Sequence, residues 1–195
     1  MGRIFIVMGK SATGKDTIYK RLLESGELKL KTAVMYTTRP IRSSEQNGVE
    51  YFFVDEEELL RLEAEHKIIE RRTYETVHGP WHYFTVNDGQ INLETANYLM
   101  IGTLETYTQI RDYYGSEHVV PIYLEVEDGV RLSRALKREM KQEEPKYAEM
   151  CRRYLADDED FSEENLKKCG VTKRFQNLDI NICLYEVTEA IKKLL

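Results

Sequence analysis

Short apolar runs alternate with segments of helical periodicity along most of this chain. The first run, Ile4 to Met8, is apolar throughout and predicts a buried strand, and Thr17 to Ser25 continues as an amphipathic helix. The same alternation is repeated downstream in the stretches Tyr98 to Ile101, Leu104 to Tyr114, Val119 to Val126, Val130 to Met140, Val171 to Phe175 and Ile182 to Leu195. Strands that alternate with helices predict a parallel sheet covered by helices on both faces, which is a three-layer α/β fold.

Two segments interrupt this alternation. Residues 36–87 are rich in Thr, Tyr, Phe and Val with Asn-Gly and Gly-Pro turn signals, and they predict a small, mainly antiparallel insertion with one helix over Glu56 to Glu65. Residues 138–168 are dense in charge and helical in pattern, which predicts a mobile, solvated helical lid. We expect a single domain whose core comprises residues 1–35, 88–137 and 169–195.

Composition and charge narrow the function classes. The net charge of −6 over 195 residues argues against a protein that coats nucleic-acid duplexes, because such a protein needs a basic stripe. The three cysteines lack Cys-x-x-Cys spacing, which predicts reduced thiols rather than a disulfide frame or a zinc site. No apolar run approaches the roughly 18 residues of a membrane span, and the N-terminal apolar stretch is too short for a signal peptide. We expect a cytoplasmic protein without a membrane partner.

The loop between the first predicted strand and helix carries candidate phosphate chemistry. Glycines let a backbone wrap around phosphate oxygens, the helix N-terminus offers unpaired N–H groups, and a lysine supplies a mobile positive charge. This strand–loop–helix context predicts a P-loop that binds a nucleotide, which the family resemblance described below implies is ATP. The expected ATP-binding residues here are Gly9, Lys10, Ser11, Ala12, Thr13, Gly14, Lys15, Asp16 and Thr17.

Asp16 departs from the commonest P-loop pattern. It occupies the position where many such loops place a magnesium-binding Ser or Thr, and Thr17 follows it. An aspartate holds the ion through water or repels the triphosphate, and the sequence leaves both outcomes open. We therefore predict no direct protein ligand for a metal, with Mg²⁺ carried by ATP near Asp16 and Thr17.

Two arginines form a second candidate site. Arg39 and Arg42 lie three residues apart in a segment that Pro40 keeps out of a helix. Their forked donors can therefore converge on one oxyanion. A solvated loop with surface charges is the alternative interpretation of the same residues.

Taken in order, these features resemble one family closely. The glycine-rich loop is followed by Thr-Thr-Arg-x-x-Arg, then Glu45, Asn47-Gly48 and Tyr51-Phe52-Phe53-Val54, and this succession resembles guanylate kinase. The resemblance is dense from residue 3 to about residue 54 and patchy beyond. It implies ATP-dependent transfer of a phosphate to GMP with Mg²⁺ accompanying ATP. Small-molecule nucleotides are the expected partners, nucleic acid is not, and the expected assembly is a monomer or a homodimer.

The resemblance also implies an acceptor site. Glu70 matches the glutamate that accepts from the N1 and amino hydrogens of guanine, an edge with two donors that adenine lacks. Tyr83 and Thr85 look like the family's tyrosine and hydroxyl that touch the monophosphate, although ordinary strand packing also explains Tyr83 and Phe84. The residues that the resemblance implies hold the acceptor phosphate are Arg39, Arg42 and Tyr51.

On the donor side, the resemblance implies a ring of positive charge. Arg134 and Arg138 are four residues apart and share one helix face, like the lid arginines that clamp the triphosphate. Arg153 is similar to the arginine of the following lid helix, and a solvated helix face is the alternative for each arginine. With Lys15 they are the expected catalytic residues, since phosphoryl transfer depends on such charge. Asn177 matches the Asn-Asp turn beside the adenine of ATP.

Three departures bear on the identity of the acceptor. Met35 stands where guanylate kinases place a serine that contacts the guanine oxygen, and a thioether is a poor donor. The strand at Leu99 to Thr103 lacks the family's aspartates, with Glu105 as the nearest acid. The segment 74–82 is an insertion with His78 and His82, but the Gly-Pro between them breaks a helix and argues against a metal site.

Other functions stay open at this point. A kinase on the same scaffold with a different acceptor is suggested by Met35 and the missing aspartates. A non-catalytic guanylate-kinase-like binding module is another possibility, but such modules typically lose the P-loop lysine that Lys15 represents. A plain NTPase switch lacks a strand that ends in a clear magnesium-binding aspartate.

Overall fold

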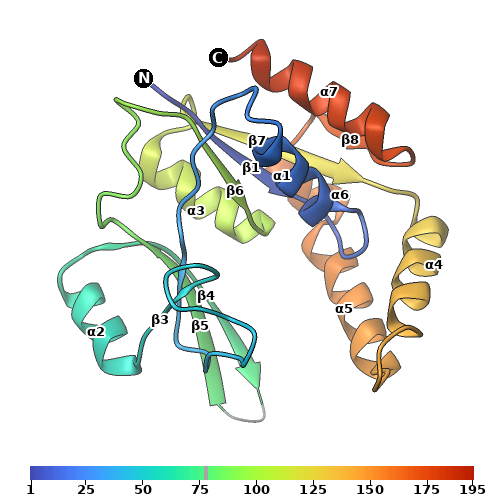
Figure 1. Cartoon of the computed structure of the whole chain (residues 1–195), viewed down its shortest axis with the longest axis horizontal. Helices are drawn as coiled ribbons and strands as arrows, with labels where there is room; N and C mark the ends of the chain where they lie inside the picture. The colour runs from blue at the N-terminus through green and yellow to red at the C-terminus, as the bar shows by residue number, and fades with distance from the viewer. Residues whose placement is uncertain (77–78) are drawn as a thin grey trace.

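The computed structural model describes residues 1–76 and 79–195. Its core is a four-stranded parallel sheet with the order β6-β1-β7-β8 (Figure 1). The bounds of these strands are Ile4–Met8 for β1, Tyr98–Ile101 for β6, Val119–Glu125 for β7 and Arg174–Gln176 for β8. Every pairing in this sheet is parallel, which confirms the core that the strand–helix alternation predicts.

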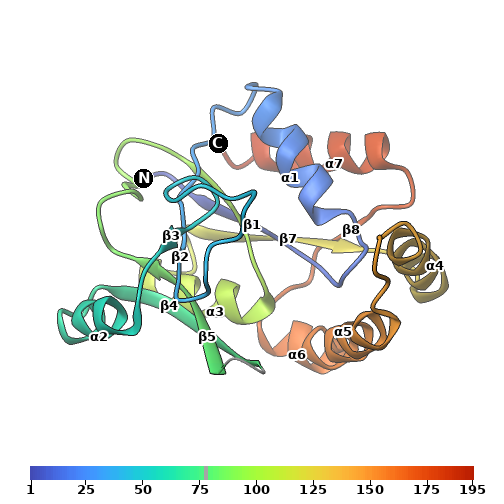
Figure 2. The same cartoon turned by 60° about the horizontal axis from the view of Figure 1, so that its bottom comes forward.

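Each face of the core sheet is covered by helices. All five residues of β1 are buried, and their side chains alternate between two separate apolar clusters. Ile4, Ile6 and Met8 pack with α3 (Leu104–Tyr114) and α6 (Glu163–Lys168), whereas Phe5 and Val7 pack with the helices of the opposite face. Those helices are α1 (Lys15–Glu24) and α7 (Ile180–Lys192), and Figure 2 shows them across the sheet from α3 and α6.

The insertion forms a second sheet with the order β3-β2-β5-β4. Its elements are β2 (Tyr36–Thr37), β3 (Phe52–Phe53), α2 (Glu56–Ala64), β4 (Ile68–Thr76) and β5 (Gly79–Val86). The β2–β5 and β4–β5 pairings are antiparallel and β2–β3 is parallel, so the sheet is mainly antiparallel as expected. The side chain of Gln109 on α3 bonds both the N–H and the carbonyl of Arg71, which fixes β4 against the core.

The charged segment contains two helices with different surroundings. These two helices are α5 (Tyr147–Asp160) and α6, and α4 (Asp128–Glu139) leads into the segment. Much of α5 is exposed, but Phe161 and Leu166 are 5% and 1% exposed and belong to the core cluster beneath β1. The stretch from 161 to 168 is therefore fixed to the core at two positions while its charged residues stay exposed, whereas the charge pattern predicts a mobile, solvated lid up to residue 168. Two apolar side chains among many charged ones suffice to anchor α6.

Candidate active site

The glycine-rich loop joins the carboxyl end of β1 to the start of α1. Gly14 has a φ of +85°, a left-handed conformation that favours glycine. Gly9 lies so close to β7 that a Cβ there would stand 2.5 Å from the carbonyl oxygen of Leu124. Inside the loop, the Thr13 hydroxyl donates to the Lys10 carbonyl over 2.7 Å. Backbone geometry therefore requires glycine at both positions, and the loop curls tightly at the helix N-terminus.

Asn177 holds this loop from the turn that follows β8. Its side chain is buried, and its amide nitrogen donates to the Thr13 carbonyl over 2.7 Å. A Cβ on Gly14 would stand 2.6 Å from the same nitrogen, so the amide and the loop fit closely. In this structure the asparagine expected beside the donor base bonds the backbone of the phosphate loop.

Asn177→Ala is expected to destabilise the chain by about 1–3 kcal/mol, because the buried Thr13 carbonyl loses its donor. Urea unfolding followed by circular dichroism measures the change. Asn181→Ala is the control, since Asn181 accepts only an exposed bond from Arg21 and its loss should cost no more than about 0.5 kcal/mol. Equal costs for the two variants would contradict a supporting role of Asn177.

The first turn of α1 carries the remaining loop residues. Lys15 is half-buried at the start of the helix, and Asp16 and Thr17 are exposed beside it. Carboxylate and hydroxyl oxygens are the ligands that Mg²⁺ takes, so Asp16 and Thr17 fit an ion that arrives with a triphosphate. Among residues 1–76 and 79–195, no group of three or more metal-ligating side chains gathers. His78 lies outside the described residues, and His82 faces the Thr73 hydroxyl at 2.8 Å.

Helix α5 supplies carboxylates to the loop. The Ser11 N–H donates to Asp157 over 2.7 Å, and the Lys10 ammonium donates to Asp158 over the same distance. Both contacts join residues almost 150 positions apart, 146 and 148 respectively. Negative oxygens therefore lie against the N–H groups and the cation of a loop suited to phosphate.

Arg131 lies beneath these carboxylates and is fully buried. Its guanidinium donates to Asp158 over 2.6 Å and to Asp128 over 3.2 Å, and it stacks on the Tyr154 ring at 3.7 Å from the centroid. Asp157 is a further partner at 3.6 Å. The sequence shows Arg131 as one of several arginines on a helix, and its buried network becomes visible only when α4 and α5 are placed together.

The three expected lid arginines are placed differently from one another. Arg134 donates to the carbonyls of Asn177 and Leu178 over 3.0 and 3.2 Å, so it faces the turn after β8. Arg138 is exposed one helical turn further on, and Arg153 is exposed on α5 with Glu149 at 3.5 Å. The structure brings Arg134 to the expected donor turn and leaves the other two at the helix surface.

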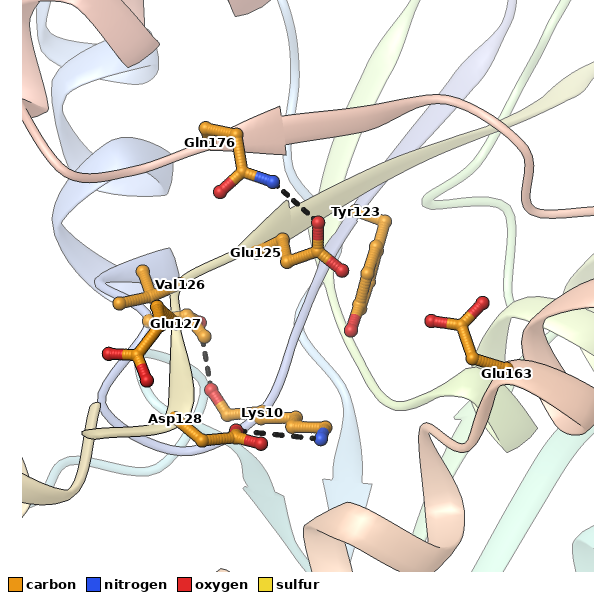
Figure 3. A pocket seen from close by; sticks show the side chains of 9 residues that line it. Lys10, Tyr123, Glu125, Val126, Glu127, Asp128, Glu163 and Gln176 are labelled. Carbon is orange, nitrogen blue, oxygen red and sulfur yellow. Dashed lines mark hydrogen bonds and ion pairs between the residues drawn. The ribbon is translucent and has the colours of Figure 1, made fainter. Parts of the chain in front are cut away.

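A cavity of about 440 Å³ opens beside the loop at the ends of β7 and β8 (Figure 3). The Lys10 side chain reaches along it, with Asp128 at 3.8 Å. The cavity is also lined by the carboxylates of Glu125, Glu127 and Glu163. Four carboxylates against one ammonium repel a triphosphate, so this cavity is unsuited to phosphate binding.

Glu45 is the shared partner of the two motif arginines, and the two motif tyrosines lie close by. Arg39 is 3% exposed and donates through both terminal nitrogens to the Glu45 carboxylate, over 3.0 and 2.8 Å. The backbone N–H of Arg42 donates to the same carboxylate over 2.9 Å. The bond to Glu45 raises the pKa of Arg39, and the same bond holds the pKa of Glu45 below its usual range. The Tyr51 and Tyr83 rings are 5.6 Å apart and Arg39 lies over Tyr51, so three of the residues expected around the acceptor phosphate lie together.

A second polar group lies at the end of the same sheet, on β4 and β5. Glu70 is 1% exposed, and its carboxylate accepts from the Thr85 hydroxyl over 3.0 Å and from Arg72 Nε over 3.1 Å. Burial raises the pKa of Glu70, against the opposing effects of Arg72 and Thr85. The terminal nitrogen of Arg72 lies 3.6 Å from the sulfur of Met35. Sequence analysis does not single out Arg72, because one arginine in an alternating strand is an ordinary solvated residue.

Strand alternation places Tyr83 and Thr85 on one face of β5 and Phe84 on the other. Phe84 points to the opposite face, where its side chain is fully buried in the apolar cluster with Leu59 and Leu62. Phe84 therefore packs as an ordinary strand residue, and the role of Tyr83 stays a prediction. Thr85 contacts Glu70 rather than the arginine cluster, which places it at the base end of the expected acceptor pocket.

The model of the guanylate kinase family matches residues 1–159. The guanylate kinase of Neisseria meningitidis serogroup A is 39% identical over 113 residues, which cover 57% of this chain and 53% of that protein. The guanylate kinase of Porphyromonas gingivalis is 33% identical over 117 residues, covering 59% and 61%. The chain thus spans about half the length of the curated relatives it matches.

A solved structure supports the fold over nearly the whole chain. The crystal structure of guanylate kinase from Anaplasma phagocytophilum superposes with a TM-score of 0.62 at 23% identity, covering 98% of this chain and 85% of that one. No helix in the described ranges has the length and apolar character needed to cross a bilayer. The parallel core, the mainly antiparallel second sheet and the family match agree with one another, and the chain belongs to the guanylate kinase family.

Proposed function

We propose that this chain transfers the γ-phosphate of ATP to GMP, giving ADP and GDP. The observation that carries the proposal is Glu70, a buried carboxylate in the sheet that also holds the Arg39–Tyr51–Tyr83 cluster. An ionised carboxylate only accepts hydrogen bonds. Guanine offers it two adjacent donors, the N1 and amino hydrogens, and adenine lacks this pair. Base selection and phosphate capture are thus available on one sheet.

The reaction is an in-line displacement in which the chain mainly positions and stabilises charge. A phosphate oxygen of GMP attacks the γ-phosphorus, and the bond from that phosphorus to the bridging oxygen breaks, so ADP leaves. The residues that stabilise the transferring phosphate are Lys15, the loop N–H groups and the lid arginines Arg134, Arg138 and Arg153. Arg39, Arg42 and Tyr51 hold the acceptor phosphate, with Tyr83 beside them.

Mg²⁺ is expected to arrive with ATP, and when bound it neutralises charge on the β- and γ-phosphates. Asp16 and Thr17 are the residues of this chain that would hold it, through their exposed oxygens at the start of α1. Asn177 keeps the loop in shape by bonding the Thr13 carbonyl. The described residues thus position the nucleotide phosphates rather than supply a base.

A coupled assay of ADP release tests the proposal, with ATP, Mg²⁺ and each of GMP, dGMP, AMP, CMP and UMP as acceptor. Turnover confined to GMP and dGMP supports it. Turnover with another acceptor alone would assign the scaffold to a different nucleotide. Binding of GMP by calorimetry without any acceptor-dependent turnover would identify a non-catalytic binding module.

Glu70→Gln is expected to lower kcat/KM for GMP by about 10- to 100-fold, because the amide loses the charge and half of the acceptors that face guanine. Any residual rate with AMP should fall by much less. Steady-state kinetics with both acceptors measure the difference. Glu63→Gln on α2 is the control, since Glu63 is exposed and pairs with Arg71 at 3.1 Å. Equal losses with GMP and AMP would remove Glu70 from base selection.

A further inference from the structure

The proposed function leaves one buried charge at the base end unused, the guanidinium of Arg72. Its side chain is 9% exposed and lies on the same face of β4 as Glu70, two residues away. Its Nε donates to Glu70 over 3.1 Å, its Nη2 lies 3.6 Å from the Met35 sulfur, and the Tyr74 hydroxyl is a further partner. A guanidinium carries five N–H donors, so it retains capacity for an acceptor on a ligand.

The position of Arg72 relative to Glu70 matches one edge of a purine. Thr85 donates to Oε1 of Glu70 and Arg72 donates to Oε2, so the two groups flank the carboxylate on opposite sides. On guanine, N1–H lies between the 6-oxo group and the 2-amino group. If the carboxylate accepts from N1–H and the amino group, one flanking residue faces the 6-oxo oxygen. Of the two flanking residues, only Arg72 is a cation. It also has N–H donors other than the Nε–H that bonds Glu70, and these can face the 6-oxo oxygen.

Met35 strengthens this assignment. Its thioether donates no hydrogen bond, and it lies beside the terminal nitrogen of Arg72. Of these two neighbours, Arg72 can therefore donate to an oxygen at the base end of the site and Met35 cannot. A charged donor also forms a stronger hydrogen bond than a hydroxyl does, so the Arg72 guanidinium can replace the serine hydroxyl that is missing at position 35.

We propose that Arg72 determines specificity by donating to the 6-oxo group of the acceptor base, so that Glu70 and Arg72 together select 6-oxopurines. This inference rests on the proposed function, because it names a contact within the same acceptor site. The pair forms one recognition unit in which the carboxylate reads two donors and the guanidinium reads the adjacent acceptor.

The test compares GMP with 6-thio-GMP, in which sulfur replaces the 6-oxo oxygen and accepts hydrogen bonds weakly. Binding is measured by calorimetry, which does not depend on turnover. Wild type should bind GMP more tightly than 6-thio-GMP. Arg72→Met should weaken GMP binding by about 10- to 100-fold and weaken 6-thio-GMP binding by less than about threefold. The preference for oxygen over sulfur should therefore nearly vanish.

An equal loss for the two ligands would show that Arg72 only orients Glu70, and it would overturn the proposal. Arg71→Met is the matched control, because Arg71 lies on the opposite face of β4 and pairs with Glu63, and its preference should equal that of wild type. If Arg72→Met does not fold, Arg72→Gln is used instead, because it keeps an amide donor and should retain part of the preference for GMP over 6-thio-GMP. If Arg72→Gln bound GMP as tightly as wild type does, with either the full wild-type preference or no preference, the proposal would be contradicted. Failure of wild type to bind GMP at all would instead overturn the proposed function.

Discussion

Lys15→Ala should lower kcat for phosphorylation of GMP by about 1000-fold while the affinity for GMP changes by less than about threefold. Lys15 opens α1 at the end of the glycine-rich loop, where its ammonium can follow the phosphate that moves. An alanine there leaves the loop N–H groups in place but removes the mobile charge. Single-turnover kinetics give the rate of the chemical step, and calorimetry with GMP gives the affinity.

Lys20→Ala is the control for Lys15→Ala. Lys20 lies on the same helix, pairs with Glu24 at 3.7 Å and has a side chain that is 76% exposed. Its removal should leave kcat unchanged within about twofold, as expected for an exposed ion pair. Activity of Lys15→Ala within a few-fold of wild type would show that the loop does not serve the transferred phosphate.

Arg39→Ala should lower kcat/KM for GMP by about 100- to 1000-fold, the second largest effect, with ATP affinity nearly unchanged. The Arg39 side chain is 3% exposed, and its two terminal nitrogens already meet the paired oxygens of Glu45. The same fork suits two oxygens of a phosphate. Steady-state kinetics at GMP concentrations well below KM measure the loss directly.

Arg39→Lys and Arg42→Ala separate the fork from the charge. Arg39→Lys keeps a charge but cannot offer two parallel donors, so most of the loss should persist. Arg42 is exposed and bonds Glu45 through its backbone N–H, so truncation of its side chain should cost less than that of Arg39. Recovery of wild-type kcat/KM by Arg39→Lys would mean that charge alone binds the acceptor.

The element order of this fold is readable from the sequence because its strands are buried on both faces. β1 and β6 are short and wholly apolar, and both begin and end where the pattern predicts. Helix starts are less accurate. Helix α4 begins at Asp128 rather than near Val130, because the Glu127 side chain caps the N–H groups of Gly129 and Val130. A cap of this kind lies outside the apolar periodicity that predicts the helix.

The sequence predicts only part of the candidate site, because the other residues depend on tertiary contacts. A contiguous motif reveals Arg39, Arg42 and Tyr51, since they lie close together in the chain. Arg72 and Arg131 acquire meaning from partners such as Met35 and Asp158, which are 37 and 27 positions away. Pattern analysis assigns isolated arginines to solvent, and only the packed strands and helices show that these two are buried.

The carboxylates of α5 on the phosphate loop have a thermodynamic consequence. Asp157 already occupies the Ser11 N–H, and Asp158 already neutralises Lys10. An entering polyanion must therefore exchange with these two carboxylates instead of filling a vacant set of donors. The net free energy of its binding would be the difference between two sets of charge-assisted bonds. We therefore expect an anion that binds this loop to weaken the two contacts that hold α5 against it.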